Sequence, residues 1–281
     1  MLEAHIVPQE DLDFFDRNGY LIIRNALDSE QIEALIEVGD ALIASDDQVS
    51  RQTGASGRYD SFRNSVAKHQ VFRDLIDHPV VLPTVVQLLG SDIHLVTSHL
   101  IYKGGDPDGT PDTFREPGWH RDYFQAQNDM GHARIQRLLV KCAYYLTDLS
   151  MANSGVTMVV PGSNRLTQAI EIPEGRVDPA GAIEPSLHPG DCLIFENRTY
   201  HAGAANQVAR TRKALMMGYG YRWIKPMDYR VQSDELLAQM TPMQRFLCGE
   251  QFVERETFDF RGGDNPIDTW CEKYGLPTVR Y

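Results

Sequence analysis

The sequence predicts a mainly β protein in which helices support a jelly-roll barrel, that is, a double-stranded β-helix. Helical patterns fill the first third of the chain, and strand patterns dominate from Asp92 onward. The length of 281 residues suits one large domain, because all-β barrels with added helices often reach this size. We therefore expect helical support over about 9–90, a barrel over about 92–225, and a helical or loop extension over about 226–281.

The first elements have recognisable start signals. Residues 9–17 predict a short helix, and residues 20–25 predict a strand. Asp28 is a favourable helix N-cap and Gln31 stands at the capping-box position, so a helix should run from there to about Ala44.

The segments that follow differ in polarity. Residues 45–65 are polar and indicate a mobile loop, whereas residues 75–76 and 80–89 suggest two helices. Residues 104–117 are rich in Gly, Pro and Asp and predict a loop beside the next motif. Active-site lids are commonly drawn from such loops.

Three residues in the strand-rich region can bind a metal. Residues 118–124 are aromatic-rich, which favours a strand start there. Residues i and i+2 of a strand share a face, so His120 and Asp122 would point the same way. His201 lies just beyond another predicted strand. Two histidines and one carboxylate can bind Fe(II) on one face and leave the opposite coordination positions open for substrate and dioxygen.

Cationic side chains follow the second histidine. The run 214–223 predicts a further strand, and Arg210, Arg212 and Lys213 precede it. A guanidinium group binds a carboxylate through two parallel charge-assisted hydrogen bonds, whereas a lysine offers a point charge. Alternation along a strand puts Arg210 and Arg212 on the same face, so the residues alone leave the choice between them open.

These motifs follow one another in a recognisable order. They are Trp119-His120-Arg121-Asp122, Ser154-Gly155-Val156-Thr157-Met158-Val159-Val160-Pro161-Gly162-Ser163, and His201 with Arg212 eleven residues later. In this order they resemble the phytanoyl-CoA dioxygenase family of Fe(II)- and 2-oxoglutarate-dependent oxygenases. Residues 14–23 also resemble the opening helix and strand of that family, so the resemblance covers about residues 10–225.

The resemblance implies a cupin-like barrel, with Fe(II), 2-oxoglutarate as co-substrate, and dioxygen. The iron ligands that it implies are His120, Asp122 and His201. Arg212 would pair with the distal carboxylate of 2-oxoglutarate, and Thr157 would donate a hydrogen bond to this co-substrate. Lys103 is similar to a lysine of some members and would help to bind an anion.

Some positions depart from the family pattern. Gly203 stands where some members carry a serine, Asn164 where many carry a histidine, and Gly118 where a glutamine is frequent. These changes spare the implied metal ligands and Arg212, and they affect secondary co-substrate contacts. Related halogenating enzymes have a small residue at the position of Asp122, so its presence predicts hydroxylation or another oxidation.

Composition limits the partners. The net charge of −12 argues against a nucleic-acid partner, because phosphate binding needs clustered Lys and Arg. No apolar stretch is long enough for a membrane span, and the N-terminus lacks a signal-peptide core. The four cysteines are scattered, which favours reduced thiols in a cytoplasmic protein. We expect a monomer or a homodimer.

The expected reaction is hydroxylation of an unactivated C–H bond in a small, largely apolar metabolite of secondary metabolism, with release of succinate and CO2. Tyr123 and Phe124 adjoin Asp122 and are candidate pocket residues, although ordinary core packing explains them as well. Arg222 is a candidate contact for a polar group of the substrate.

Two other interpretations stay open at this point. One is a cupin-type metalloenzyme, a direct dioxygenase or an isomerase, that does not use 2-oxoglutarate; Arg212 and Thr157 argue against it. The other is a catalytically silent barrel that binds a ligand, and the intact set of implied iron ligands argues against that.

Overall fold

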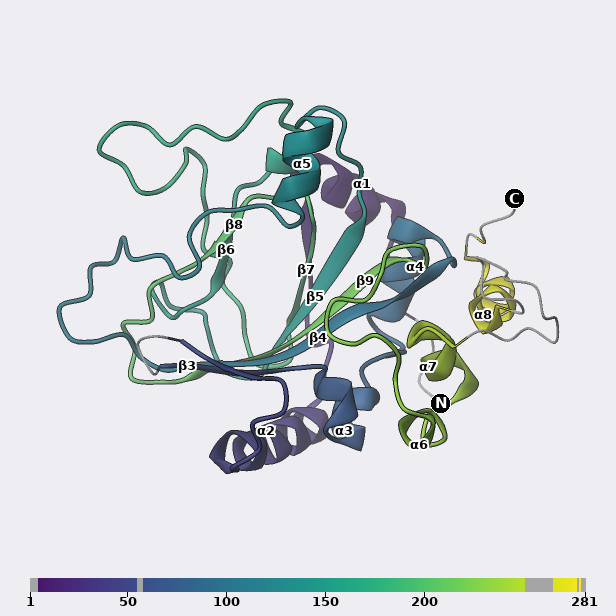
Figure 1. Ribbon diagram of the computed structural model, residues 1–281. Helices are drawn as coiled ribbons and strands as arrows, with labels where there is room; N and C mark the ends of the chain where they lie inside the picture. The colour runs from purple at the N-terminus through teal and green to yellow at the C-terminus, as the bar shows by residue number, and fades with distance from the viewer. Residues whose placement is uncertain (1–4, 55–57, 251–264, 277, 279–281) are drawn as a thin grey trace.

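Antiparallel strands form the centre of the computed structural model, which describes residues 5–54, 58–250, 265–276 and 278 (Figure 1). The strands are β1 (Tyr20–Ile23), β2 (Arg51–Thr53), β3 (Tyr59–Arg63), β4 (Ile93–Lys103), β5 (Leu139–Tyr145), β6 (Thr157–Val159), β7 (Cys192–Glu196), β8 (His201–Gly203) and β9 (Arg212–Tyr221). Seven of them form one sheet in the order β1-β7-β5-β9-β4-β3-β2, and β6 pairs with β8 in a second sheet. All strand pairs are antiparallel.

Helices gather on one side of the large sheet and at its ends (Figure 1). The α-helices are α1 (Gln9–Asn18), α2 (Ser29–Ala44), α3 (Gln70–Arg73), α4 (Leu82–Leu89), α5 (Phe124–Met130), α6 (Asp234–Leu237), α7 (Pro242–Leu247) and α8 (Pro266–Tyr274). Two short 3-10 helices, η1 (Ser65–Ala67) and η2 (Ser163–Arg165), complete the described elements. None of these helices has both the length and the apolar composition needed to cross a membrane.

The large sheet has a hydrophobic core on each face. On β5, Cys142 and Tyr144 belong to the core that the helices cover, while Ala143 and Tyr145 belong to a second core on the other face. This alternation follows from the two-residue period of a strand. The second core also includes Met158 of β6, so the small sheet packs against this inner face. The space between the two sheets is where a ligand site can form.

The predicted fold class is confirmed: the protein is mainly β, with supporting helices. Within the described residues, hydrogen bonds divide the strands between two facing sheets and do not close a barrel. The predicted start of α2 is also confirmed. The Asp28 carboxylate accepts a hydrogen bond from the Gln31 backbone N–H at 2.8 Å, and the Gln31 side chain accepts one from the Asp28 N–H at 3.0 Å.

The prediction of a loop over residues 45–65 was wrong in part, because β2 and β3 lie within it. β2 is the edge strand of the large sheet and β3 lies next to it, and polar side chains of both strands remain partly exposed. An ion pair of 2.6 Å between Arg51 and Asp60 joins the two. The polar composition of this segment therefore led to the prediction of a loop where the structure has two strands at and next to the sheet edge.

The expected strand over residues 118–124 was also wrong. The chain there forms a single β-bridge, between His120 and His201, and then turns into α5. Tyr123 has a φ angle of 57°, in the left-handed region, which ends the extended backbone before the helix starts. The aromatic residues that suggested a strand stand at this reversal.

Candidate active site

His120 and His201 are held together by their backbones. The His120 N–H donates to the His201 carbonyl at 3.0 Å, and the His201 N–H donates to the His120 carbonyl at 3.0 Å. Asp122 follows two residues after His120. One ligand atom from each of the three side chains lies within 4.8 Å of the others, so the structure brings the three expected iron ligands together.

The two imidazole rings are oriented by backbone carbonyls. Nδ1 of His120 lies 2.8 Å from the Gly118 carbonyl, and Nδ1 of His201 lies 2.9 Å from the Thr199 carbonyl. A carbonyl can only accept, so each Nδ1 donates its proton and each Nε2 keeps its lone pair for a metal. Burial lowers the pKa of His201 to about 3, which keeps that ring neutral.

The carboxylate of Asp122 uses its two oxygens differently. Oδ1 accepts a hydrogen bond from Nζ of Lys141 at 2.8 Å, whereas Oδ2 is buried and has no hydrogen-bond partner among the described residues. Burial works to raise the pKa of Asp122, but Lys141 and the two histidines outweigh it and lower the pKa. A charged carboxylate with one free, buried oxygen fits a divalent cation.

A cavity of about 150 Å³ is lined by His120 and His201 together with Arg212 and Thr157. Arg212 begins β9 and is buried; one of its Nη atoms donates to the Gly155 carbonyl at 2.8 Å, while its buried Nε has no partner within the described part of the chain. The Tyr145 hydroxyl donates to Oγ1 of Thr157 at 2.7 Å, which leaves the threonine proton free to donate into the cavity. The cavity therefore ends in donors for a carboxylate.

The two candidate arginines differ in burial. Arg210 is exposed and forms an ion pair of 3.2 Å with Asp148, whereas Arg212 lines the cavity. Lys103 is the register partner of Arg212 on β4, and its ammonium group donates to the Ala204 carbonyl at 3.1 Å. Lys103 is buried beside the cavity but is not among the residues that line it.

The model of the phytanoyl-CoA dioxygenase (PhyH) family matches residues 15–214 of the chain. The chain belongs to this family. Family membership confirms the resemblance seen in the sequence, and with it the enzyme class and its cofactors. This member of the phytanoyl-CoA dioxygenase family is an Fe(II)- and 2-oxoglutarate-dependent dioxygenase.

Relatives and solved structures agree with this membership. The chain is 31% identical to an ectoine dioxygenase of Nocardia farcinica, over 72% of this chain and 74% of the relative. It is 26% identical to an ectoine dioxygenase of Halomonas elongata, over 75% and 69%. The non-heme alpha-ketoglutarate-dependent epimerase SnoN shares the fold, with a TM-score of 0.61 and 19% identity over 76% of this chain and 80% of that one. The carbocyclase SnoK gives a TM-score of 0.58 and 19% identity, over 84% and 92%.

One departure from the family pattern has a steric cause in this member. Gly203 pairs with the chain around Pro117, and a Cβ atom at position 203 would lie 2.1 Å from the Glu116 carbonyl oxygen. A serine cannot occupy that position unless the backbone moves. The tight approach of residues 116–117 to β8 therefore explains the glycine.

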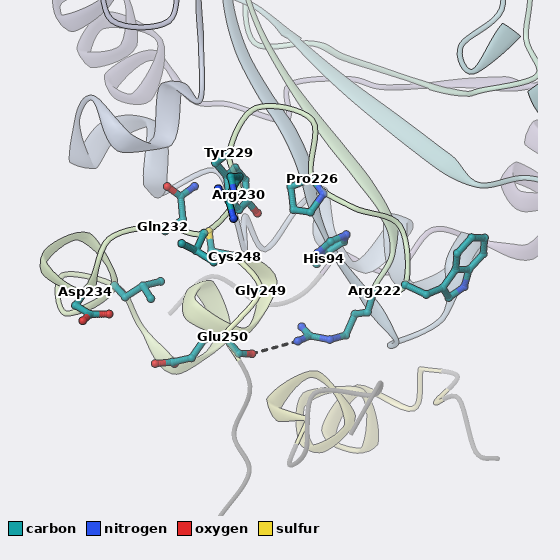
Figure 2. Close-up of a pocket in the computed structure, with 13 residues that line it drawn as sticks. His94, Arg222, Pro226, Tyr229, Arg230, Gln232, Asp234, Cys248, Gly249 and Glu250 are labelled. Atoms are coloured by element: carbon teal, nitrogen blue, oxygen red, sulfur yellow. Dashed lines mark hydrogen bonds between the residues drawn. The ribbon is translucent and has the colours of Figure 1, made fainter. Parts of the chain in front are cut away.

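The three substrate-pocket candidates do not line the cavity next to the metal ligands. Tyr123 has a buried hydroxyl without a hydrogen-bond partner in the described chain, and the side chain of Phe124 is 59% exposed at the start of α5. Arg222 lines a separate cavity of about 690 Å³, where it donates to the Glu250 carbonyl (Figure 2). Its guanidinium group also stacks on the Phe246 ring. Arg222 follows the last residue of β9, whereas Arg212, which lines the metal-proximal cavity, is the first residue of that strand.

Other residues line the metal-proximal cavity without having been expected there. They are Tyr59, Arg63, His99, Ile101, Pro117, Lys141, Phe195 and Met216, besides residues of β8. Lys141 had a detectable signal, because it is the one charged residue in the apolar sequence of β5. Tyr59 and Arg63 had no such sequence signal, because they belong to β3, which lies in the polar segment that was predicted to be a loop.

Proposed function

We propose that this dioxygenase hydroxylates an unactivated C–H bond of a small metabolite, with His120, Asp122 and His201 as the iron ligands. The observation that carries the proposal has two parts: one ligand atom from each of the three side chains lies within 4.8 Å of the others, and His120 and His201 line a cavity that Arg212 also lines. When bound, Fe(II) with 2-oxoglutarate and dioxygen supplies the oxidising power, and succinate and CO2 are released. The protein supplies positions, charges and exclusion of water.

Arg212 would hold the distal carboxylate of 2-oxoglutarate. Its guanidinium group is buried, partly unpaired and fixed by the Gly155 carbonyl, so little reorganisation is needed to accept an anion. Thr157, oriented by Tyr145, would donate a hydrogen bond to the same co-substrate. Lys103 would add positive charge from behind Arg212, at the adjacent position of β4.

The rest of the cavity wall would receive the substrate. Ile101, Phe195 and Met216 give it an apolar part, which suits a C–H bond as the reacting group. Two polar residues interrupt this wall. Nε2 of His99 is buried without a partner in the described chain, and Arg63 is about one-third exposed. We propose that a polar group of the substrate binds at Arg63 and His99, and not at Arg222.

The wider setting of the enzyme stays a proposal. We propose a cytoplasmic monomer or homodimer that works without nucleic acid or a membrane. The net charge of −12 and four buried free thiols support this setting, because phosphate binding needs clustered basic residues and free thiols persist in a reducing compartment.

Product analysis tests the proposed function. The purified protein is incubated aerobically with Fe(II), 2-oxoglutarate and a panel of small metabolites that begins with ectoine, because two relatives are ectoine dioxygenases. The expected result is release of succinate together with a product that is one oxygen atom heavier than its substrate. The release of succinate must depend on added Fe(II). Oxidation of a panel member without consumption of 2-oxoglutarate would contradict the proposal.

A further inference from the structure

Lys141 is a charged residue in an apolar, central strand. β5 lies between β7 and β9 in the large sheet, and its other residues are uncharged. The Lys141 side chain is 17% exposed and passes between Phe195 of β7 and Gly218 of β9, its two register partners. An added Cβ atom at Gly218 would lie 3.8 Å from Cγ of Lys141, so the lysine stem packs directly over this glycine.

The ammonium group ends at Asp122. Nζ lies 2.8 Å from Oδ1, and 5.8 Å from the centre of the Phe195 ring. Stability alone does not account for this arrangement, since replacing a largely buried ion pair by apolar residues is often neutral or stabilising. The lysine therefore requires a functional explanation.

The geometry of Asp122 points to that explanation. Lys141 occupies Oδ1, and Oδ2 is the buried oxygen without a partner among the described residues. Groups that hydrogen-bond to a metal ligand fix its orientation and increase its affinity for the metal. We propose that Lys141 is a positioning residue, which holds Oδ1 so that Oδ2 faces the metal; this inference rests on the proposed function, in which Asp122 binds iron.

Two effects of Lys141 oppose each other. Its charge repels a divalent cation, which weakens metal binding. Its hydrogen bond fixes the carboxylate, and its charge compensates that of Asp122 while the metal is absent. The ammonium group touches Asp122 directly, so we expect positioning to exceed repulsion. Loss of the ammonium group should then weaken metal binding by about 10- to 100-fold.

The test compares three variants of the full-length protein. Lys141→Met keeps the aliphatic stem that packs on Phe195 and removes the ammonium group. Lys141→Gln keeps a hydrogen-bond donor without the charge. Lys213→Met is the matched control, because Lys213 forms an ion pair of 2.6 Å with Asp40 away from the cavity. Thermal unfolding shows that each variant is folded, and Mn(II) titration followed by electron paramagnetic resonance gives metal affinity without turnover.

The expected result is a 10- to 100-fold weaker affinity for Mn(II) in Lys141→Met, partial recovery in Lys141→Gln, and no change in Lys213→Met. Equal or tighter binding in Lys141→Met overturns the inference, as does an equal loss in Lys213→Met. If Lys141→Met does not fold, Lys141→Gln decides alone, and a loss of less than twofold overturns the inference. Absence of metal binding in the unaltered protein would instead refute the proposed function.

Discussion

The backbones of His120 and His201 exchange two hydrogen bonds of 3.0 Å, which places their ring centres 4.2 Å apart. This pairing joins a loop residue to the first residue of β8. It does not involve the side chains. The scaffold of the site therefore exists independently of the groups that would bind the metal.

This independence predicts that removal of one ligand leaves the fold intact. His120→Ala should lose iron binding and at least 100-fold of activity, because two remaining ligands hold the metal weakly. The thermal midpoint should change by only a few degrees, since the two backbone bonds remain. Metal analysis after loading with Fe(II), together with thermal unfolding, checks both statements. His188→Ala, at an exposed site, is the control; full activity in His120→Ala would refute the ligand assignment.

Substitution of Arg212 and substitution of Arg210 should have very different effects on the KM for 2-oxoglutarate. Arg212→Ala removes a charge-assisted contact of about 1.5–3 kcal/mol, so the KM for 2-oxoglutarate should rise by about 10- to 100-fold. Arg210→Ala removes an exposed ion pair with Asp148 and should have little effect. Initial rates at varied 2-oxoglutarate concentrations distinguish the two. A rise in KM for Arg210→Ala alone would show that the wrong arginine has been assigned.

Tyr145 should act on the co-substrate through Thr157. Tyr145→Phe removes the hydroxyl that lies 2.7 Å from Oγ1 of Thr157, so the threonine loses its fixed orientation. One neutral hydrogen bond contributes about 0.5–1.5 kcal/mol, which predicts a rise in the KM for 2-oxoglutarate of about 2- to 10-fold. Thr157→Val should raise it at least as much. An unchanged KM in Thr157→Val would exclude a contact between Thr157 and 2-oxoglutarate.

Two buried histidines away from the metal site predict acid instability. Burial lowers the pKa of His78 to about 4, and burial together with Arg222 lowers the pKa of His94 to about 4. In the unfolded chain a histidine has a pKa of about 6.5. The contribution of the two buried, neutral histidines to stability is therefore fully present above pH 6.5 and is lost as the pH falls from 6.5 to 4. At pH 5 each of these histidines should lower the free energy of unfolding by about 2 kcal/mol.

Urea unfolding at pH 7.5 and at pH 5 measures this cost. The variant His78→Gln should lose less stability between the two pH values than the unaltered protein, by about 2 kcal/mol. His188→Gln, at an exposed histidine, should behave like the unaltered protein. Equal losses in all three proteins would show that His78 is not the source of the acid sensitivity.

The features that the sequence predicted well are those with a local physical signature. The capping box at Asp28 is one, since both of its hydrogen bonds join residues three apart. The strand predicted over 214–223 is another: it is observed as β9 (Arg212–Tyr221), and most residues of its apolar run are buried. Residue type and order in the sequence also pointed to His120, Asp122 and His201, and the structure brings one ligand atom from each within 4.8 Å of the others.

The features that were missed depend on contacts between distant segments. The polar residues of β3 reveal no strand until β4 provides an edge to pair with. His99 and Arg63 are register partners across that edge, 36 residues apart in the chain, and no local pattern connects them. Arg222 shows the converse: it follows β9 closely in sequence, yet its guanidinium group contacts the Phe246 and Glu250 carbonyls far from the metal ligands.

The central claim is that one cavity holds iron and 2-oxoglutarate together, and an anaerobic titration tests it most directly. Fe(II) and then 2-oxoglutarate are added to the purified protein, and the visible absorption is recorded. A weak charge-transfer band that requires both additions is the predicted result, because it arises when 2-oxoglutarate chelates the bound iron, and Arg212→Ala should need more 2-oxoglutarate to produce it. Iron binding without such a band at any 2-oxoglutarate concentration would contradict the account.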